Sequence, residues 1–169
     1  HLLRDGPADA SWLAALEETM AAQGVAIAAS RRDVAMQIDQ ACATNAGPFP
    51  RARLVMAGEV EASLGEMPAL AAEDALRQRF AAQRRIDADA GITTYGPHRS
   101  DLLVEHAGNG MPAPQCSTGE QKALLLAILL AQARLLAAAR GTAPLMLLDE
   151  VAAHLDAERR AALFAELLD

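Results

Sequence analysis

Residues 117 to 156 decide how the rest of the chain is interpreted: they read Ser117-Thr118-Gly119-Glu120-Gln121, then a long apolar segment, then Pro144-Leu-Met-Leu-Leu-Asp149-Glu150, and then His154-Leu155-Asp156. Residues 120–140 contain strong helix formers and neither Gly nor Pro, which predicts one helix. The run Leu145–Leu148 is short, wholly apolar and closed by two acids, which is typical of a strand buried on both faces of a sheet. The stretch therefore predicts an α/β fold.

This order of elements predicts a ligand site at one sheet edge. A helix that leads through a short turn into a strand runs antiparallel to it, so the start of the helix lies at the edge where Asp149 and Glu150 emerge. A helix N-terminus suits an anion such as phosphate, and Gly119 allows a ligand to approach the backbone closely. An Asp after a strand suits Mg²⁺, and an adjacent Glu can orient a water molecule. The alternative for Ser117-x-x-Glu120 is an ordinary capping box.

The same motifs resemble those of ABC-type ATPases. Ser117–Gln121 resembles their signature motif, Leu147–Glu150 their Walker B motif, and His154–Asp156 their D-loop. Together with Tyr95-Gly-Pro-His98-Arg99-Ser-Asp-Leu102, this version resembles the RecF family of bacterial DNA replication and repair ATPases. No Gly-x-x-x-x-Gly-Lys-Ser/Thr occurs, so we expect a fragment without the N-terminal, phosphate-cradling half of an ATPase head.

The resemblance implies an ATP-dependent DNA-binding factor that acts at single-strand gaps and helps to load recombinase. It implies a cytoplasmic homodimer that sandwiches ATP between two heads, contacts single-/double-strand DNA junctions and meets other recombination mediator proteins. By position in the motifs, the implied roles are trans phosphate contacts for Ser117, Gly119 and Gln121, Mg²⁺ binding for Asp149, positioning of the attacking water for Glu150, and a place at the dimer seam for Asp156.

The resemblance also implies that the intact protein is a weak DNA-dependent ATPase. We expect this chain alone to be inactive, because nucleotide affinity in such enzymes comes largely from the P-loop cradle and its Lys. The alternative from another class is a helical protein-interaction module without nucleotide chemistry, in which the motifs are only helix caps.

Composition limits the remaining function classes. The chain has 169 residues, 52% of them hydrophobic, and a net charge of −7. DNA contacts would therefore need local clusters such as Arg31-Arg32 or Arg84-Arg85, or basic residues outside this fragment. For the Arg-rich face of the 69–89 helix, a solvated surface is the alternative. Cys42 and Cys116 lack ligand spacing, which favours reduced, buried thiols over a zinc site. The longest apolar run has nine residues (Ala123–Ala131), which argues against a membrane span.

The pattern along the chain predicts a helical lobe over residues 1–90 and a partial ATPase head over residues 91–169. A first helix is predicted from about Ala10 to Thr44, and a heptad stripe on it is predicted to pack against a neighbouring helix or lobe: Leu13, Met20, Ile27, Val34 and Ala41. A second long helix is predicted over 69–89. Residues 51–55, 92–95 and 101–106 are β-prone, and Gly108-Asn109-Gly110 predicts a hairpin turn.

The motif Gly96-Pro97-His98-Arg99 predicts a tight connection rather than a metal site. For Arg99 two interpretations stay open, which are a contact to phosphate or DNA and a surface salt bridge.

Overall fold

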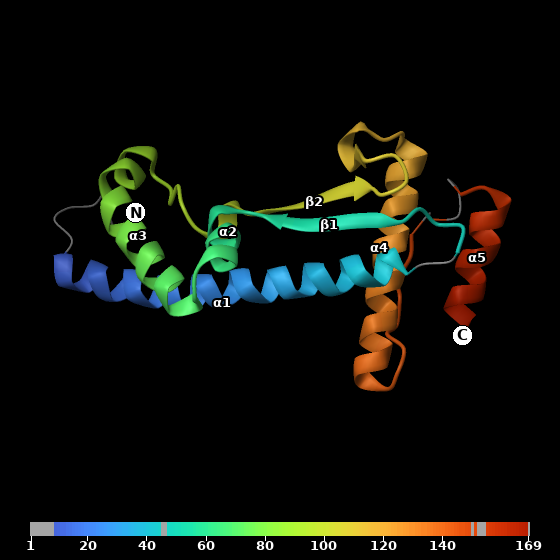
Figure 1. Cartoon of the computed structure of the whole chain (residues 1–169), viewed down its shortest axis with the longest axis horizontal. Coiled ribbons are helices and arrows are strands. Elements are labelled where there is room, and N and C mark those ends of the chain that lie inside the picture. The colour runs from blue at the N-terminus through green and yellow to red at the C-terminus, as the bar shows by residue number, and fades with distance from the viewer. Residues whose placement is uncertain (1–8, 45–46, 150, 152–154, 169) are drawn as a thin grey trace. The chain divides into compact units, whose positions relative to one another are not determined.

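The chain has an α/β fold, as predicted (Figure 1). The computed structural model describes residues 9–44, 47–149, 151 and 155–168. In chain order the elements are α1 (Ala10–Ala43), β1 (Ala52–Ala57), α2 (Glu59–Glu66), α3 (Ala69–Ala90), a 3-10 helix (Pro97–Arg99), β2 (Asp101–His106), β3 (Met111–Pro112), a second 3-10 helix (Ala113–Gln115), α4 (Thr118–Arg140) and α5 (Ala157–Leu168). The predicted long helices and the strands near residues 51–55 and 101–106 are confirmed, whereas residues 92–95 form no strand.

The sheet has the strand order β1-β2-β3. Strands β2 and β3 are antiparallel, with His106 opposite Met111. The turn between them contains Gly110 at a φ of 68°, a left-handed conformation that favours glycine. The predicted hairpin turn at 108–110 is therefore confirmed.

The chain forms two compact units, and both are discontinuous in sequence. The first combines the described residues up to Asp33 with Met56–Leu102, and the second combines the described residues of Val34–Val55 and Leu103–Asp169. Helix α1 contributes residues to both units. This division differs from a single boundary near residue 90, and the assignment of 1–90 and 91–169 to separate domains stays a prediction.

In the first unit, α1 packs through its small residues. Ala21, Val25 and Ala28 are buried together with Leu76 and Phe80 of α3. Gly24 lies in this contact, because a Cβ added there would stand 3.1 Å from Leu76 Cδ2. Small side chains permit such a close approach of two helices.

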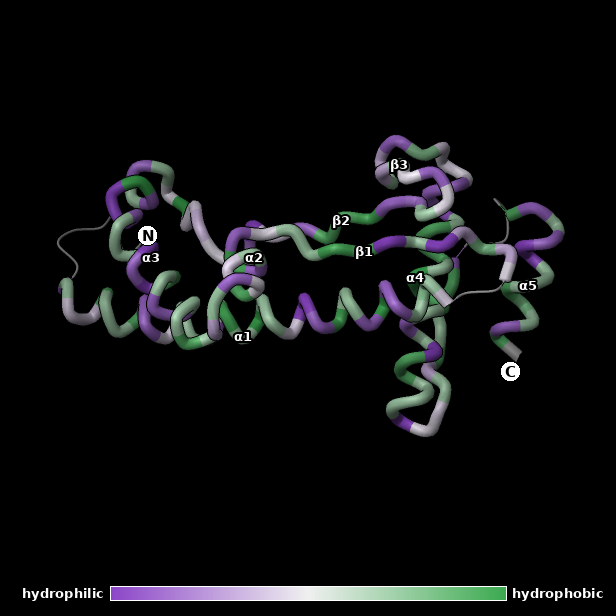
Figure 2. Tube along the Cα trace, in the orientation of Figure 1, coloured by the Kyte–Doolittle hydropathy of each residue, from purple (hydrophilic) through white to green (hydrophobic). Residues whose placement is uncertain are grey.

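The predicted packing stripe on α1 is wrong at its centre. Met20, Ile27 and Val34 are exposed by 45%, 45% and 49%. Side-chain hydrophobicity favours these larger residues, but the close approach at Gly24 requires the small residues on the neighbouring face. Along α1, hydrophobic and hydrophilic residues alternate from turn to turn (Figure 2), and the buried positions within the hydrophobic set cannot be distinguished by hydropathy alone.

In the second unit, α4 is the central element. One buried cluster joins Leu124 and Ala131 of α4 to Ala52 and Leu54 of β1. Another joins Leu126, Ala127 and Leu130 to Leu155 and Leu163, with Met146 and Leu148 packed against it. By length and composition α4 could also cross a membrane, but the core helix of a soluble protein passes the same test, and α4 carries six buried residues.

The predicted strand at Leu145–Leu148 differs in the structure. The segment has no strand assignment, and its burial alternates: Leu145 and Leu147 are 89% and 90% exposed, whereas Met146 and Leu148 pack against the cluster on α4. The prediction of a strand buried on both faces is therefore wrong for this chain. Only one face has a packing partner among the described residues, and the ladder that defines a strand is not formed.

Candidate functional site

The start of α4 is a fully formed capping box. Ser117 is the N-cap, and its hydroxyl oxygen accepts a bond from the Glu120 backbone N–H at 3.4 Å. The Glu120 carboxylate in turn accepts from the Ser117 backbone N–H at 2.9 Å and from the Ser117 hydroxyl at 2.7 Å. These bonds hold the pKa of Glu120 below its ordinary value, with the bond from the Ser117 side chain as the main cause. The capping interpretation is thus confirmed, and it does not exclude a ligand at the same helix end.

Gly119 leaves the helix start open on its outer side. A Cβ added at Gly119 would meet nothing within 4 Å. The side-chain amide of Gln121 donates to the Cys116 carbonyl at 2.9 Å. The first backbone N–H groups of a helix have no partner within the helix, so an anion can approach them at Gly119 without displacing a side chain.

Of the three acids with predicted roles, the structure describes Asp149 and Asp156. Residues 144–149 return alongside α4 toward the end at which that helix begins (Figure 1), and Asp149 is exposed. Glu150 lies outside the described residues. Asp156 caps α5, because its carboxylate accepts from the Arg159 backbone N–H at 2.8 Å and lies 3.6 Å from the Arg159 guanidinium. The structure therefore places Asp149 after a segment that returns along α4, and it gives Asp156 a structural role at the start of α5.

The motif at residues 96–101 belongs to the first unit and contains the 3-10 helix Pro97–Arg99. Gly96 has a φ of 135°, and its carbonyl accepts from the Arg99 backbone N–H at 3.0 Å. A ring nitrogen of His98 lies 2.8 Å from the Thr93 carbonyl oxygen. Among the residues that the structure describes, no group of three or more potential metal ligands occurs. His98 lies in the 3-10 helix Pro97–Arg99, which forms the predicted tight connection.

Two anchors of this loop were not predicted. The Arg31 guanidinium donates to the Pro97 carbonyl at 2.8 Å, and the Ser100 hydroxyl donates to the buried Glu61 carboxylate at 2.6 Å. Both partners lie 39 or more positions away in sequence, so spacing alone gave no signal. The glycine at position 58 was a weak signal of the second contact, because a Cβ there would overlap both Glu61 and Ser100.

The basic clusters that were considered for DNA contact differ in their partners. Arg84 makes a bidentate ion pair with Glu17, and both nitrogen–oxygen distances are 2.6 Å. The hydrogen bond to Glu17 raises the pKa of Arg84. Arg31 is held by Pro97 as described, whereas Arg32 and Arg85 remain exposed. A DNA contact by any of these residues stays a prediction.

Both cysteines are free thiols in the interior. Cys42 and Cys116 are buried, and burial is the main cause that raises the pKa of each thiol. The predicted burial of both thiols is confirmed, and the reduced state stays a prediction.

A protein family described as "AAA domain, putative AbiEii toxin, Type IV TA system" matches residues 46–169. The chain belongs to this AAA-domain family. The match includes the start of α4, the returning segment and α5, which carry every motif at residues 117–156.

Relatives of known name support the same assignment. The DNA replication and repair protein RecF of Mesorhizobium japonicum is 50% identical over 99% of this chain and 45% of its own length. RecF of Brucella abortus is 49% identical over 99% of this chain and 44% of its own length. The resemblance to RecF is therefore confirmed, and the chain spans less than half the length of these relatives.

Solved structures support the fold. The structure of the recombination mediator protein RecF-ATP in the RecFOR pathway covers 98% of this chain and 44% of that chain, with a TM-score of 0.76 and 21% identity. The corresponding RecF-ATPrS structure gives a TM-score of 0.77 at 20% identity. The described residues thus share the fold of one part of these proteins.

Proposed function

We propose that this chain is the signature and Walker B part of an ATP-dependent DNA replication and repair factor of the RecF type. The observation that carries the proposal is the arrangement on α4. A helix start with an open glycine and the segment that ends in Asp149 belong to one compact unit, and that segment returns alongside the helix. The relatives at about 50% identity are named for DNA replication and repair, which gives the arrangement its biological context.

The start of α4 is proposed to contact the γ-phosphate of ATP that is held by a second copy of the protein. The phosphate would approach the backbone at Gly119, and the Ser117 hydroxyl would turn from Glu120 toward it. The phosphate then replaces the Glu120 carboxylate as the anion at this helix end, where the helix dipole favours negative charge. Gln121 is a further phosphate contact in this proposal, after it leaves the Cys116 carbonyl.

Asp149 and Glu150 are proposed to act on the nucleotide bound to their own head. Asp149 would bind Mg²⁺ directly or through water, Glu150 would orient the attacking water, and Asp156 would lie at the seam between two heads. The backbone edge of residues 145–148, which joins no sheet among the described residues, is proposed to pair with a strand of the intact protein that carries the P-loop. The intact protein would bind DNA junctions, meet other mediator proteins and work in the cytoplasm.

The substitution Glu150→Gln in the intact protein tests this function. A carboxylate that orients the attacking water contributes roughly 10²–10⁴-fold to such a reaction, so we expect ATP turnover to fall by about that factor. Dimerisation with ATP should persist, because ATP is bound but not hydrolysed. The matched control is Glu158→Gln, at an exposed position near the start of α5, which should leave turnover within about twofold.

Unchanged turnover and unchanged dimerisation in the Glu150→Gln protein would contradict the proposal. That result would favour the helical protein-interaction module, in which the start of α4 is only a capped helix.

A further inference from the structure

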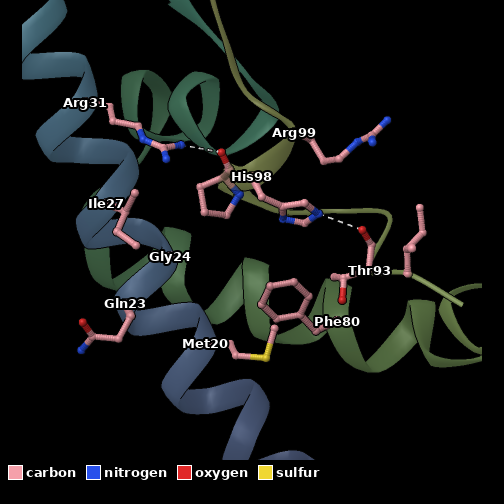
Figure 3. A pocket seen from close by; sticks show the side chains of 11 residues that line it. Met20, Gln23, Gly24, Ile27, Arg31, Phe80, Thr93, His98 and Arg99 are labelled. Carbon is pink, nitrogen blue, oxygen red and sulfur yellow. Dashed lines mark hydrogen bonds between the residues drawn. The ribbon is translucent and has the colours of Figure 1, made fainter. Parts of the chain in front are cut away.

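The first unit contains a groove that the proposed nucleotide chemistry does not use. It lies between α1 and the loop from Ile92 to Arg99, with Phe80 of α3 at its base, and its volume is about 670 Å³ (Figure 3). A volume of this size accommodates several side chains of a bound segment. The groove belongs entirely to the first unit, whereas the start of α4 belongs to the second.

The walls of the groove expose large apolar side chains. Met20 and Ile27 come from successive heptad positions of α1, and Ile92 comes from the opposite loop, with exposures of 45%, 45% and 59%. Exposed apolar groups that converge on one depression are typical of a binding surface. Removing apolar surface from water is favourable, so burial of these three side chains favours an apolar occupant.

The charge of the groove has one sign. Its charged or titratable lining residues are Arg31, His98 and Arg99, and no acidic side chain of the described residues lines it. This contrasts with the chain as a whole, which carries a net charge of −7. Arg31 uses one nitrogen to donate to Pro97 and has further N–H groups to offer, and Arg99 extends outward at the rim (Figure 3). The groove is therefore complementary to an acidic occupant.

Hydrogen bonds hold the wall that the loop forms. The bonds from Arg31 to the Pro97 carbonyl, from the His98 ring to the Thr93 carbonyl and from Ser100 to Glu61 fix it at three points. A preformed wall lowers the entropic cost of binding, because the loop does not have to be ordered by the ligand.

We propose that this groove binds an acidic, apolar segment of a partner protein. Leu, Ile, Met or Phe side chains of the partner would fill the space between Ile27 and Ile92, and Asp or Glu side chains beside them would meet Arg31 and Arg99. Single-stranded nucleic acid fits less well, since it needs exposed aromatic rings for base stacking, and the aromatic residue of the lining, Phe80, is only 6% exposed.

Selection from a random peptide library tests the chemistry of the occupant. The probe is a phage-displayed library of random 12-residue peptides, selected on the intact protein without nucleotide and counter-selected on its Ile27→Glu variant. Ile27 is half exposed, so the variant is expected to fold. Its matched control is Val34→Glu, one heptad further along α1, exposed by 49% and outside the groove lining.

The expected result is a set of peptides that combine Asp or Glu with large apolar residues. A labelled peptide from this set should bind at least tenfold more weakly to the Ile27→Glu and Arg99→Glu proteins. Its affinity for the Val34→Glu and Arg32→Glu proteins should stay within twofold.

Several results would overturn the proposal. One is a selected set without an excess of acids, and another is the absence of peptides that depend on Ile27. Competition by a dT20 oligonucleotide would assign the groove to nucleic acid instead. Self-association that is lost in Ile27→Glu but retained in Val34→Glu, measured by sedimentation, would assign it to a second copy. Because the selection uses no nucleotide, these outcomes are independent of the Glu150→Gln test.

Discussion

Two extended apolar segments pack on α4, and they differ in what lies on their other side. In β1, Ala52 and Leu54 face the cluster on α4 while Arg53 and Val55 are exposed, and β1 pairs with β2. In residues 145–148, Met146 and Leu148 face α4 while Leu145 and Leu147 are exposed, and the segment joins no sheet among the described residues. The side-chain pattern is the same, but only β1 has a ladder.

Alternating burial and a strand ladder have separate causes, although one sequence pattern predicts both. Alternating burial follows from packing one face of an extended chain on a helix. A ladder also requires a second strand that satisfies the backbone N–H and C=O groups. In β1 both causes operate, whereas residues 145–148 have only the first. In the intact protein we therefore expect a further strand beside the backbone of residues 145–148 and a covering layer over the exposed leucines.

The largest expected effect is at the paired strand. Leu54→Ala removes a buried side chain from the cluster on α4 and should lower the free energy of unfolding by about 2–5 kcal/mol. Leu147→Ala makes the same chemical change at a 90% exposed position and should stay within about 0.5 kcal/mol. Urea unfolding of this chain measures both. Equal losses in the two variants would contradict the one-sided packing of residues 145–148.

A smaller effect is expected at the start of α4, the helix on which both segments pack. Ser117→Ala removes the N-cap hydroxyl and should lower the free energy of unfolding by about 1 kcal/mol. Thr118→Ala, at the exposed first position of the helix, is the matched control and should change it by less than about 0.5 kcal/mol. Thermal unfolding without nucleotide measures both. A Ser117→Ala protein as stable as the control would mean that the two packed faces of α4, and not its cap, fix the start of the helix.

The smallest effect is the pH dependence of the same cap. Because bonds from Ser117 lower the folded-state pKa of Glu120 below its ordinary value of 4.5, the ionised carboxylate stabilises the fold above that value. This contribution is lost as the pH falls through the lowered pKa. The difference in unfolding free energy between the natural protein and Glu120→Gln should therefore be constant near neutral pH and shrink below about pH 4.5. A difference that does not change over this range would contradict the ionised capping box.

The sequence was sufficient for the elements that depend on local signals. The cap at Ser117, the length of α4 up to Gly141 and the turn at Gly108–Gly110 all follow from residues close in sequence, and the structure has them. The motif order also identified the family correctly, because matches at fixed spacing over residues 117–156 rarely coincide by chance.

The parts that were predicted wrongly, were not predicted or stay predictions depend on distant residues or on a bound nucleotide. The buried face of α1 is set by the close approach of α3 at Gly24, which no periodicity in α1 encodes. The ladder at residues 145–148 depends on a strand, and the loop anchors at Arg31 and Glu61 depend on residues far along the chain. The roles of Ser117, Gln121 and Asp149 need a bound nucleotide, and Glu150 lies outside the described residues.

The central claim, that the start of α4 contacts nucleotide held by another copy, is tested most directly at Gly119. A methyl group at Gly119 meets nothing within 4 Å of this chain, and Ala favours helix, so Gly119→Ala should not destabilise the fold. A methyl group at Gly65 in α2 also meets nothing within 4 Å, so Gly65→Ala is the matched control. ATP-dependent dimerisation of the intact protein is measured by analytical ultracentrifugation. The account predicts at least tenfold weaker dimerisation for Gly119→Ala and a change within twofold for Gly65→Ala, whereas full ATP-dependent dimerisation of Gly119→Ala would contradict it.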